Sequence, residues 1–289
     1  MERGEAGVRG PIGWARLDPA TKTSQSEPGL PGGPARSPRP AHDHAGARGG
    51  GSPVPRRPQR GRAPSAETVR EIYRRLKRAL GPLDPPRRLD PIEELVLTVL
   101  SQNTSDVNRD RAFEAMRSAY PSWEALAGAH EGELAAAIRP GGLSNVKAPR
   151  ILSILAEIRD REGGVLDLSW MRSARSDRIR RYLMSLPGVG PKTTACVLAF
   201  SLGRRALPVD THVYRVAQRL GFFDARTNAI RAHATMERSV PPRLRIGMHV
   251  GMIRLGRRVC RPGRPACEVC PLQDLCPTAP SVLRGRRGR

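Results

Sequence analysis

Acidic side chains, aromatic rings and long apolar runs are all scarce in this chain. Asp and Glu number 27 against 50 Lys and Arg, so the formal net charge is +23, and aromatic residues make up only 4%. No run approaches the roughly 18 consecutive apolar residues that a membrane span requires. The N-terminus also lacks the charged-then-apolar order of a secretion signal. We therefore expect a soluble, intracellular protein with no membrane partner.

The composition is dominated instead by a large excess of positive charge. Such a surface attracts polyanions, of which nucleic acid is the commonest. A genome biased toward arginine codons produces the same excess. Charge alone therefore does not establish a nucleic-acid partner, and the motifs must decide.

Cysteine is scarce as well, and its placement is uneven. Cys196 lies alone in an apolar run, which indicates core packing, and the other four cysteines lie close together. A disulfide framework spreads cysteines through a small secreted domain, so this clustering argues against one. Four neighbouring thiolates can hold zinc tetrahedrally or a [4Fe–4S] cluster, and the residues alone do not choose between them. The four, separated by six, two and five residues, are Cys260, Cys267, Cys270 and Cys276.

The chain divides by composition into a tail and a folded part. Residues 1–64 are rich in Pro, Gly, Ser and Arg and have too few apolar side chains to offset the entropy of ordering them, so we predict a disordered basic tail. From Ser65 onward apolar residues recur at helical spacing, without a convincing strand pattern. Asp90 and Pro91 form a capping signal for one helix. The fold class is all-α, with further helices expected over residues 107–120, 131–138, 146–158, 177–185, 191–203, 211–220 and 244–256.

The segment Leu186-Pro187-Gly188-Val189-Gly190 is the most informative part of the sequence. It separates two predicted helices by a tight turn, where glycine adopts backbone angles that other residues avoid. The turn leaves N–H groups beside the start of the second helix, where the helix dipole favours an anion such as a DNA phosphate. An ordinary helix-turn-helix corner has the same pattern, so Gly188 and Gly190 alone do not establish DNA binding.

Two polar residues after this turn are candidates for chemistry. Lys192 lies in the first turn of the second helix, where the dipole disfavours a cation, and a buried amine there would be neutral and nucleophilic. A surface lysine that contacts phosphate is the alternative. Asp210 follows 18 positions later (210 − 192) and precedes another helical pattern. It can cap that helix, and a capping carboxylate is held ionised and immobile, as an electrostatic stabiliser should be.

The string LPGVGPKTTACVLAF, the later VDTH and the cysteine cluster together resemble the endonuclease III family of base-excision glycosylases, which share a helix-hairpin-helix, a Gly/Pro-rich loop and an Asp. The resemblance covers about residues 66–277 and implies two helical lobes with a DNA-binding cleft between them. The implied parts are an N-terminal helix (65–83) that packs with a cluster domain (206–277), a six-helix barrel (84–205) with the helix-hairpin-helix (about 177–203), and a basic C-terminal tail (278–289).

The resemblance also implies roles for individual residues. Lys192 attacks the sugar C1′ and expels the damaged base, a Schiff base forms and undergoes β-elimination, and Asp210 stabilises the cationic sugar. The four clustered cysteines hold a [4Fe–4S] cluster. Leu143 aligns with a wedge residue, and Asn103, with Gln102 beside it, aligns with a residue that fills the gap left by the base. The implied DNA contacts are Gly188, Val189, Gly190, Leu143, Gln102, Asn103, Lys147 and His212.

The function implied is that of a monomeric DNA glycosylase with AP lyase activity. Its substrates would be oxidised or ring-saturated pyrimidines or abasic sites in duplex DNA. It would act in the cytoplasm at the nucleoid of a bacterium, or in the nucleus or mitochondria of a eukaryote. Three alternatives stay open: a mismatch-specific thymine/uracil or other monofunctional glycosylase, a helix-hairpin-helix DNA-binding module, and an iron–sulfur redox protein.

The sequence bears unequally on these alternatives. One monofunctional branch of the superfamily removes adenine. Its members carry Glu where this chain has Thr98, lack Lys at position 192 and have a further C-terminal domain. The joint presence of Lys192 and Asp210 argues against a noncatalytic module. A redox protein would leave the basic charge and the hairpin unexplained. A thymine/uracil glycosylase is the hardest to exclude, because one sequence does not reveal the residues of a base pocket.

Overall fold

The computed structural model describes residues 63–85 and 88–287, and these are helical and irregular, without a strand. The predicted all-α fold class is therefore confirmed. The predicted basic tail at 1–64 lies outside the described residues as far as residue 62. None of the described helices is long and apolar enough to cross a bilayer.

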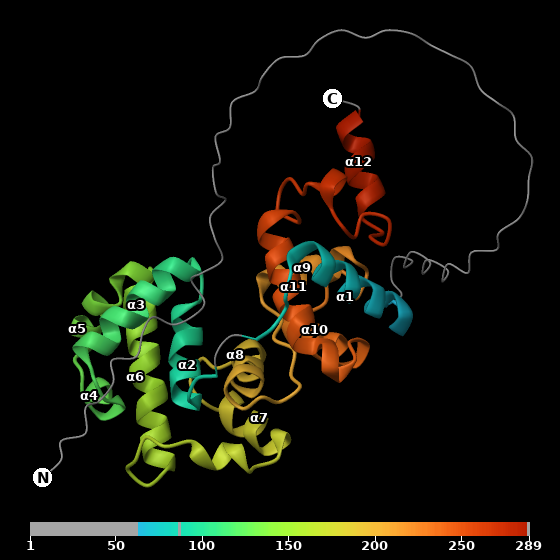
Figure 1. The fold of residues 1–289 in the computed structure, drawn as a ribbon. Helices are drawn as coiled ribbons and strands as arrows, with labels where there is room; N and C mark the ends of the chain where they lie inside the picture. Colours follow the sequence, from blue (N-terminus) through green and yellow to red (C-terminus); the bar gives the residue numbers. More distant parts are fainter. Residues whose placement is uncertain (1–62, 86–87, 288–289) are drawn as a thin grey trace, which may run out of the picture. The chain divides into compact units, whose positions relative to one another are not determined.

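The helices follow one another with short connections (Figure 1). A π-helical stretch, η3 (Val197–Ser201), directly continues α8. In chain order the α-helices are α1 (Ala66–Leu80), α2 (Pro91–Leu100), α3 (Asp106–Ala119), α4 (Trp123–Ala127), α5 (Glu131–Ala137), α6 (Ser144–Arg161), α7 (Ser176–Met184), α8 (Pro191–Cys196), α9 (Thr211–Arg219), α10 (Ala229–Ser239), α11 (Arg245–Arg258) and α12 (Ala279–Arg287).

The buried apolar side chains form two cores. The first gathers residues between Leu89 and Ala206, from α2 to the π-helical stretch. The second joins apolar residues of α1 to residues between Leu207 and Leu275. The chain thus passes from one core to the other just before Asp210, which places that residue where the two cores meet.

The packing of α1 against α11 brings distant parts of the sequence together (Figure 1). A Cβ atom on Gly247 would lie 2.7 Å from the Tyr73 ring, and one on Gly251 would lie 3.1 Å from Leu76. These two glycines therefore allow the helix axes to approach closely. Such long-range packing stabilises a helix more than its intrinsic propensity does.

Two ion pairs join elements of the first core to elements of the second. Arg257 of α11 pairs with Asp106 at the start of α3. Arg180 of α7 pairs with Glu237 of α10 at 2.9 Å, and Glu237 also accepts from the backbone N–H of Leu207 at 3.2 Å. These contacts hold the two cores around the segment that leads to Asp210.

The local capping prediction for α2 is confirmed. The Asp90 side chain accepts a hydrogen bond from the Ile92 N–H at 2.9 Å, and Pro91 occupies the first helical position. Because Pro has no N–H, it loses nothing at a position whose N–H has no partner within the helix.

Sequence patterns missed three helices. Helix α4 is too short for a periodic signal, and α10 is rich in polar residues on most of its surface. Helix α12 lies within residues 278–289, which we predicted as a basic tail; Ala279 at its start is buried. Of the basic residues predicted in that tail, Arg289 lies outside the described residues.

Candidate functional site

The turn between α7 and α8 has the predicted tight geometry. Gly188 has a φ of +67°, in the region that glycine adopts without steric cost. A Cβ atom there would lie 2.8 Å from the Arg150 side chain. Val189 is only 6% exposed, so its side chain packs in the core and only its backbone could meet a phosphate. Gly190 is the N-cap of α8.

Lys192 lies in the first turn of α8 and is partly exposed. Its Nζ donates a hydrogen bond to the Ser101 hydroxyl at 3.4 Å, and that hydroxyl donates to the Thr98 carbonyl at 2.7 Å. The amine is therefore held near the C-terminal end of α2 while part of its side chain reaches solvent. This is the access that a nucleophile for an external substrate requires.

Asp210 is the N-cap of α9, as its sequence context predicts. Its Oδ1 accepts from the Val213 N–H at 2.7 Å. The carboxylate also lies at the N-terminal end of α9, the positive end of the helix dipole. Asp210 is thus a fixed and partly exposed negative charge.

Two buried histidines hold the backbone just before Asp210. The Val209 N–H donates to His233 Nε2 at 3.0 Å, and the Pro208 carbonyl lies 2.8 Å from His249 Nδ1. Because His233 accepts at Nε2 and lies 2.8 Å from the Ala229 carbonyl through Nδ1, its ring is neutral with the proton on Nδ1. Neither histidine was singled out from the sequence, because a lone His in a helical pattern carries no motif.

The charges of both Lys192 and Asp210 act on the buried imidazole of His249. It is 3% exposed, and burial lowers its pKa most strongly. The negative charge of Asp210 raises that pKa and the positive charge of Lys192 lowers it. Both charges therefore act on the same imidazole, which places the two candidate residues in one electrostatic neighbourhood.

These histidines predict how stability depends on pH. Burial lowers the pKa of His212, His233 and His249, whereas an unfolded histidine titrates near pH 6.5. Below about pH 6.5 the unfolded chain therefore binds more protons than the folded chain, and stability is lost as the pH falls. We expect the melting temperature, followed by circular dichroism, to drop between about pH 7 and pH 5.

The variant His233→Gln should melt with a weaker pH dependence, because Gln can accept from the Val209 N–H but does not titrate. His130→Gln, a change at an exposed histidine, is the matched control. A melting temperature that stays constant over this pH range would contradict the prediction.

The loops predicted to probe the duplex contain two strained residues. Asn103 and Leu143, with φ of +52° and +50°, are the only non-glycine residues with positive φ in the described part of the chain. Leu143 is 53% exposed at the start of α6, and Asn103 is exposed at the end of α2. Backbone strain of this kind costs about 1–3 kcal/mol and gathers at functional sites.

Gln102 is occupied within the protein. Its Oε1 accepts from Arg150 Nη1 at 2.7 Å, and the same Arg150 packs against Gly188 of the hairpin. Arg150 thus links the loop after α2 to the hairpin, a role that its unremarkable place in α6 did not reveal. His212 also has an internal contact, since its Nδ1 lies 3.1 Å from Arg215 Nη2.

The prediction that Lys147 contacts DNA phosphate is wrong for this structure. Lys147 is 1% exposed, and its Nζ donates to the carbonyls of Leu100 and Gly141 at 2.8 Å each. Burial lowers the pKa of its ammonium group. The side chain therefore ties the end of α2 to the loop before α6, because those two carbonyls have no helical partner.

We expect Lys147→Met to destabilise the fold without changing phosphate contacts. Two buried carbonyls would lose their donor, at a cost of about 2–4 kcal/mol in urea unfolding. The salt dependence of DNA binding should keep its slope, whereas loss of a phosphate contact would lower that slope by about one. Lys77→Met, at an exposed position of α1, is the control for removing a lysine. A lower slope together with unchanged stability would restore the phosphate role.

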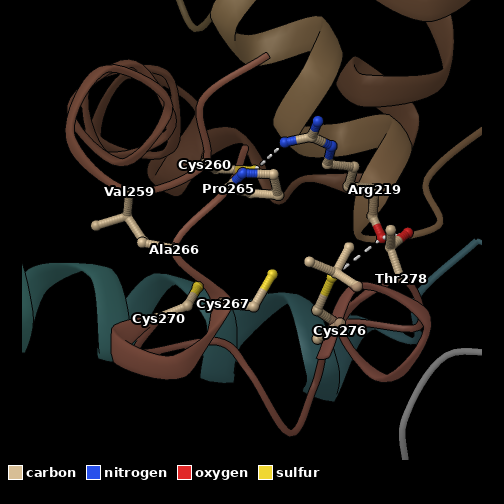
Figure 2. Close-up of a pocket in the computed structure, with 11 residues that line it drawn as sticks. Arg219, Val259, Cys260, Pro265, Ala266, Cys267, Cys270, Cys276 and Thr278 are labelled. Atoms are coloured by element: carbon tan, nitrogen blue, oxygen red, sulfur yellow. Dashed lines mark hydrogen bonds between the residues drawn. The ribbon is translucent and has the colours of Figure 1, made fainter. Parts of the chain in front are cut away.

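The four clustered cysteines line one pocket between the end of α9 and the start of α12 (Figure 2). The sulfur atoms of Cys267, Cys270 and Cys276 point from their loop toward the same space, with Cys260 across from them. The pocket walls are otherwise mainly apolar, from side chains such as Val259, Ala266 and Val282.

The chemistry of this pocket fits a bound metal cluster. Burial, with a smaller contribution from the other three thiols, raises the pKa of Cys270 to about 11. Four thiols so placed gain from a cation that stabilises their deprotonated forms. Arg219 supplies positive charge, since its Nη1 lies 3.2 Å from Cys260 Sγ. The four thiols surround one pocket, but in the described part of the chain no three Cys, His, Asp or Glu side chains lie as close together as the ligands of a single metal ion.

Comparisons with known proteins bear on this site. Residues 96–242 match the family described as HhH-GPD superfamily base excision DNA repair protein. Endonuclease III of Thermotoga maritima is 34% identical over 210 residues, which cover 73% of this chain and 91% of that protein. A candidate DNA glycosylase of Arabidopsis thaliana is 34% identical over 158 residues, 55% of this chain, and the chain spans 54% of that protein's length.

Two further matches, one curated relative and one solved structure, cover different shares of the chains compared. DNA glycosylase/AP lyase ROS1 of Arabidopsis thaliana is 30% identical over 171 residues, 53% of this chain but only 12% of that protein. A solved complex, a trapped covalent intermediate of endonuclease III with DNA, matches with a TM-score of 0.65 and 28% identity, over 78% of this chain and 99% of that one.

Proposed function

Because the chain belongs to the HhH-GPD superfamily of base excision DNA repair proteins, we propose that it is a DNA glycosylase with AP lyase activity on duplex DNA. The observation that carries this proposal is the partly exposed amine of Lys192, held at the end of α2 by Ser101, together with the partly exposed carboxylate of Asp210 that caps α9. The likeness to the trapped endonuclease III complex and to the named AP lyase supports it.

The chemistry follows from these two side chains. The damaged nucleotide must first leave the base stack, because its C1′ is otherwise inaccessible. The neutral amine of Lys192 forms a bond to C1′, and the glycosidic bond breaks with its electron pair leaving on the base. The developing positive charge on the sugar is stabilised by Asp210, which α9 holds in place.

Strand cleavage follows from the same covalent bond. Ring opening gives a Schiff base between Lys192 and C1′, whose positive charge makes the C2′ proton acidic. Loss of that proton breaks the C3′–O bond and nicks the strand on the 3′ side of the lesion. We assign Asp210 to assist these proton transfers as well.

We assign the cysteine pocket to a [4Fe–4S] cluster held by Cys260, Cys267, Cys270 and Cys276. When bound, the cluster would cross-link the segment from α11 to α12 through four iron–sulfur bonds. Arg261 and Arg264 lie in the exposed loop between the first two cysteines, where they can meet phosphates.

We further propose that Leu143 and Asn103 enter the duplex and that the substrates are oxidised or ring-saturated pyrimidines. An exposed apolar wedge stabilises a kinked duplex by filling the space between base steps. Among the two adjacent amides, Asn103 suits insertion better, because Gln102 is already bound to Arg150.

A panel of single-lesion duplexes tests the proposed function. Pure protein is incubated with each duplex, and base release is measured separately from strand nicking. We expect release and nicking at similar rates on oxidised pyrimidines. Release without nicking would favour a monofunctional thymine or uracil glycosylase. Binding with neither reaction would leave only a DNA-binding module.

A further inference from the structure

A buried carboxylate lies in α2, the helix that packs against α8 and its proposed nucleophile. Glu94 of α2 is 3% exposed. Its Oε1 accepts from the Thr98 hydroxyl at 3.1 Å, while Oε2 is buried without a hydrogen-bond partner in the described residues. Buried carboxylates are normally paired, because an unpaired one loses its hydration without compensation. The partly satisfied Glu94 is therefore unexplained by the needs of the fold.

The geometry connects Glu94 to Lys192. Glu94, Thr98 and Ser101 are spaced by four and three residues, so they lie along one face of α2. Helix α2 packs against α8, where Lys192 and Cys196 are also four residues apart. Two helix faces with matching polar groups thus meet in an otherwise apolar core.

Contacts run along both faces. Lys192 Nζ bonds to Ser101 at the far end of α2, and the buried Cys196 thiol interacts with both Lys192 and Thr98. Thr98 in turn donates to Glu94. A hydroxyl and a thiol therefore link the carboxylate to the amine without a direct ion pair among the described residues.

Charged groups around this pair come from several helices. Lys192 of α8 has the largest effect of any charge on Glu94, ahead of Arg109 of α3 and Glu93 of α2 itself. Arg109 is paired with Asp106 and Asp110. On the other side, Lys192 acts on Cys196 and on the buried His233 and His249.

Burial also brings the titration of Glu94 close to neutral pH. Burial raises the pKa of Glu94 to about 7, more than Lys192 and Thr98 lower it. A group that titrates near neutrality both accepts and returns protons at the pH where repair occurs.

We propose that Glu94 is the internal proton acceptor that keeps Lys192 available as a neutral amine. One proton leaves Nζ and reaches the Glu94 carboxylate through Thr98 and Cys196, so that both side chains become uncharged. The lone pair on Nζ is then available for C1′. Glu94 acts only through Lys192, so it is a positioning residue, and the inference rests on the proposed function of Lys192.

The test is the pH profile of single-turnover borohydride trapping on a duplex that contains an abasic site. For the wild-type protein we expect the rate to rise with a midpoint near pH 7, where Glu94 titrates. In Glu94→Gln the midpoint should move up by at least about one pH unit, so the rate at pH 7 should fall about tenfold and recover at high pH. The matched control Glu93→Gln removes the same charge one position away. Because Glu93 raises the pKa of Glu94, this change should not move the midpoint upward.

The outcomes separate this inference from the proposed function. A purely structural role of Glu94 would slow trapping equally at every pH, and an unmoved midpoint in folded Glu94→Gln would overturn the inference. If that variant does not fold, Thr98→Val gives a second measurement. It removes the hydroxyl that links Glu94 to the relay and that lowers the pKa of Glu94, so the midpoint should move upward. Absence of trapping by the wild-type protein at every pH would overturn the proposed function itself.

Discussion

The variant Lys192→Gln should form no borohydride-trapped complex with DNA that contains an abasic site. Gln has nearly the shape of Lys but no nucleophilic amine, so the covalent bond to C1′ cannot form. We expect the trapped fraction to fall by at least about a thousandfold, on the scale seen when the nucleophile of a covalent enzyme is removed. The measurement is gel separation of the cross-linked protein–DNA species after a fixed time.

Binding distinguishes loss of chemistry from loss of fold. Lys192→Gln should still bind the same duplex, because the hairpin backbone and the exposed loops are unchanged. Lys77→Gln removes an exposed lysine in α1, far along the sequence from the site, and should trap like the wild-type protein. Undiminished trapping by Lys192→Gln would show that another amine forms the Schiff base.

The variant Cys270→Ser should lose its bound iron and much of its stability. The thiolate is the metal ligand, and a serine hydroxyl does not deprotonate to take its place. Structural metal sites in small domains supply on the order of 10 kcal/mol, so losing one should lower the melting temperature strongly. Iron analysis, the visible absorption band and thermal melting measure the effect.

Cys196→Ala is the matched control for this experiment. Cys196 is buried in the first core, away from the four clustered thiols, so its removal should leave the iron content unchanged. Wild-type protein that contains stoichiometric zinc and no iron would contradict the iron–sulfur assignment. In that case the four thiols would still hold a structural metal, as the residues alone allow.

Local chemistry determined a large part of the structure. The cap formed by Asp90, the tight turn at Gly188 and the cap formed by Asp210 depend on neighbouring residues in the chain, and each occurs where the sequence predicts it. The clustering of four cysteines likewise needs only a short loop to bring them to one pocket. For these features, the residues that interact are close together in the sequence as well as in space.

Features that depend on burial escaped sequence reasoning. A lysine in an amphipathic helix is normally exposed, yet Lys147 is buried because it bonds the carbonyl of the preceding loop at Gly141 and that of Leu100 at the end of α2. Glu94 lies in the acidic first turn of α2, which is an ordinary pattern for the start of a helix, and its burial depends on the packing of α2 in the core. His233 and His249 hold the segment before Asp210 from helices that follow it in the chain.

The sequence by itself therefore determined which residues could carry chemistry and how the chain turns beside them. The tertiary structure decided which of those residues remain accessible and which buried groups act on them. The physical reason is that a side chain's charge state and exposure depend on neighbours from other helices, and spacing along one helix does not specify those neighbours.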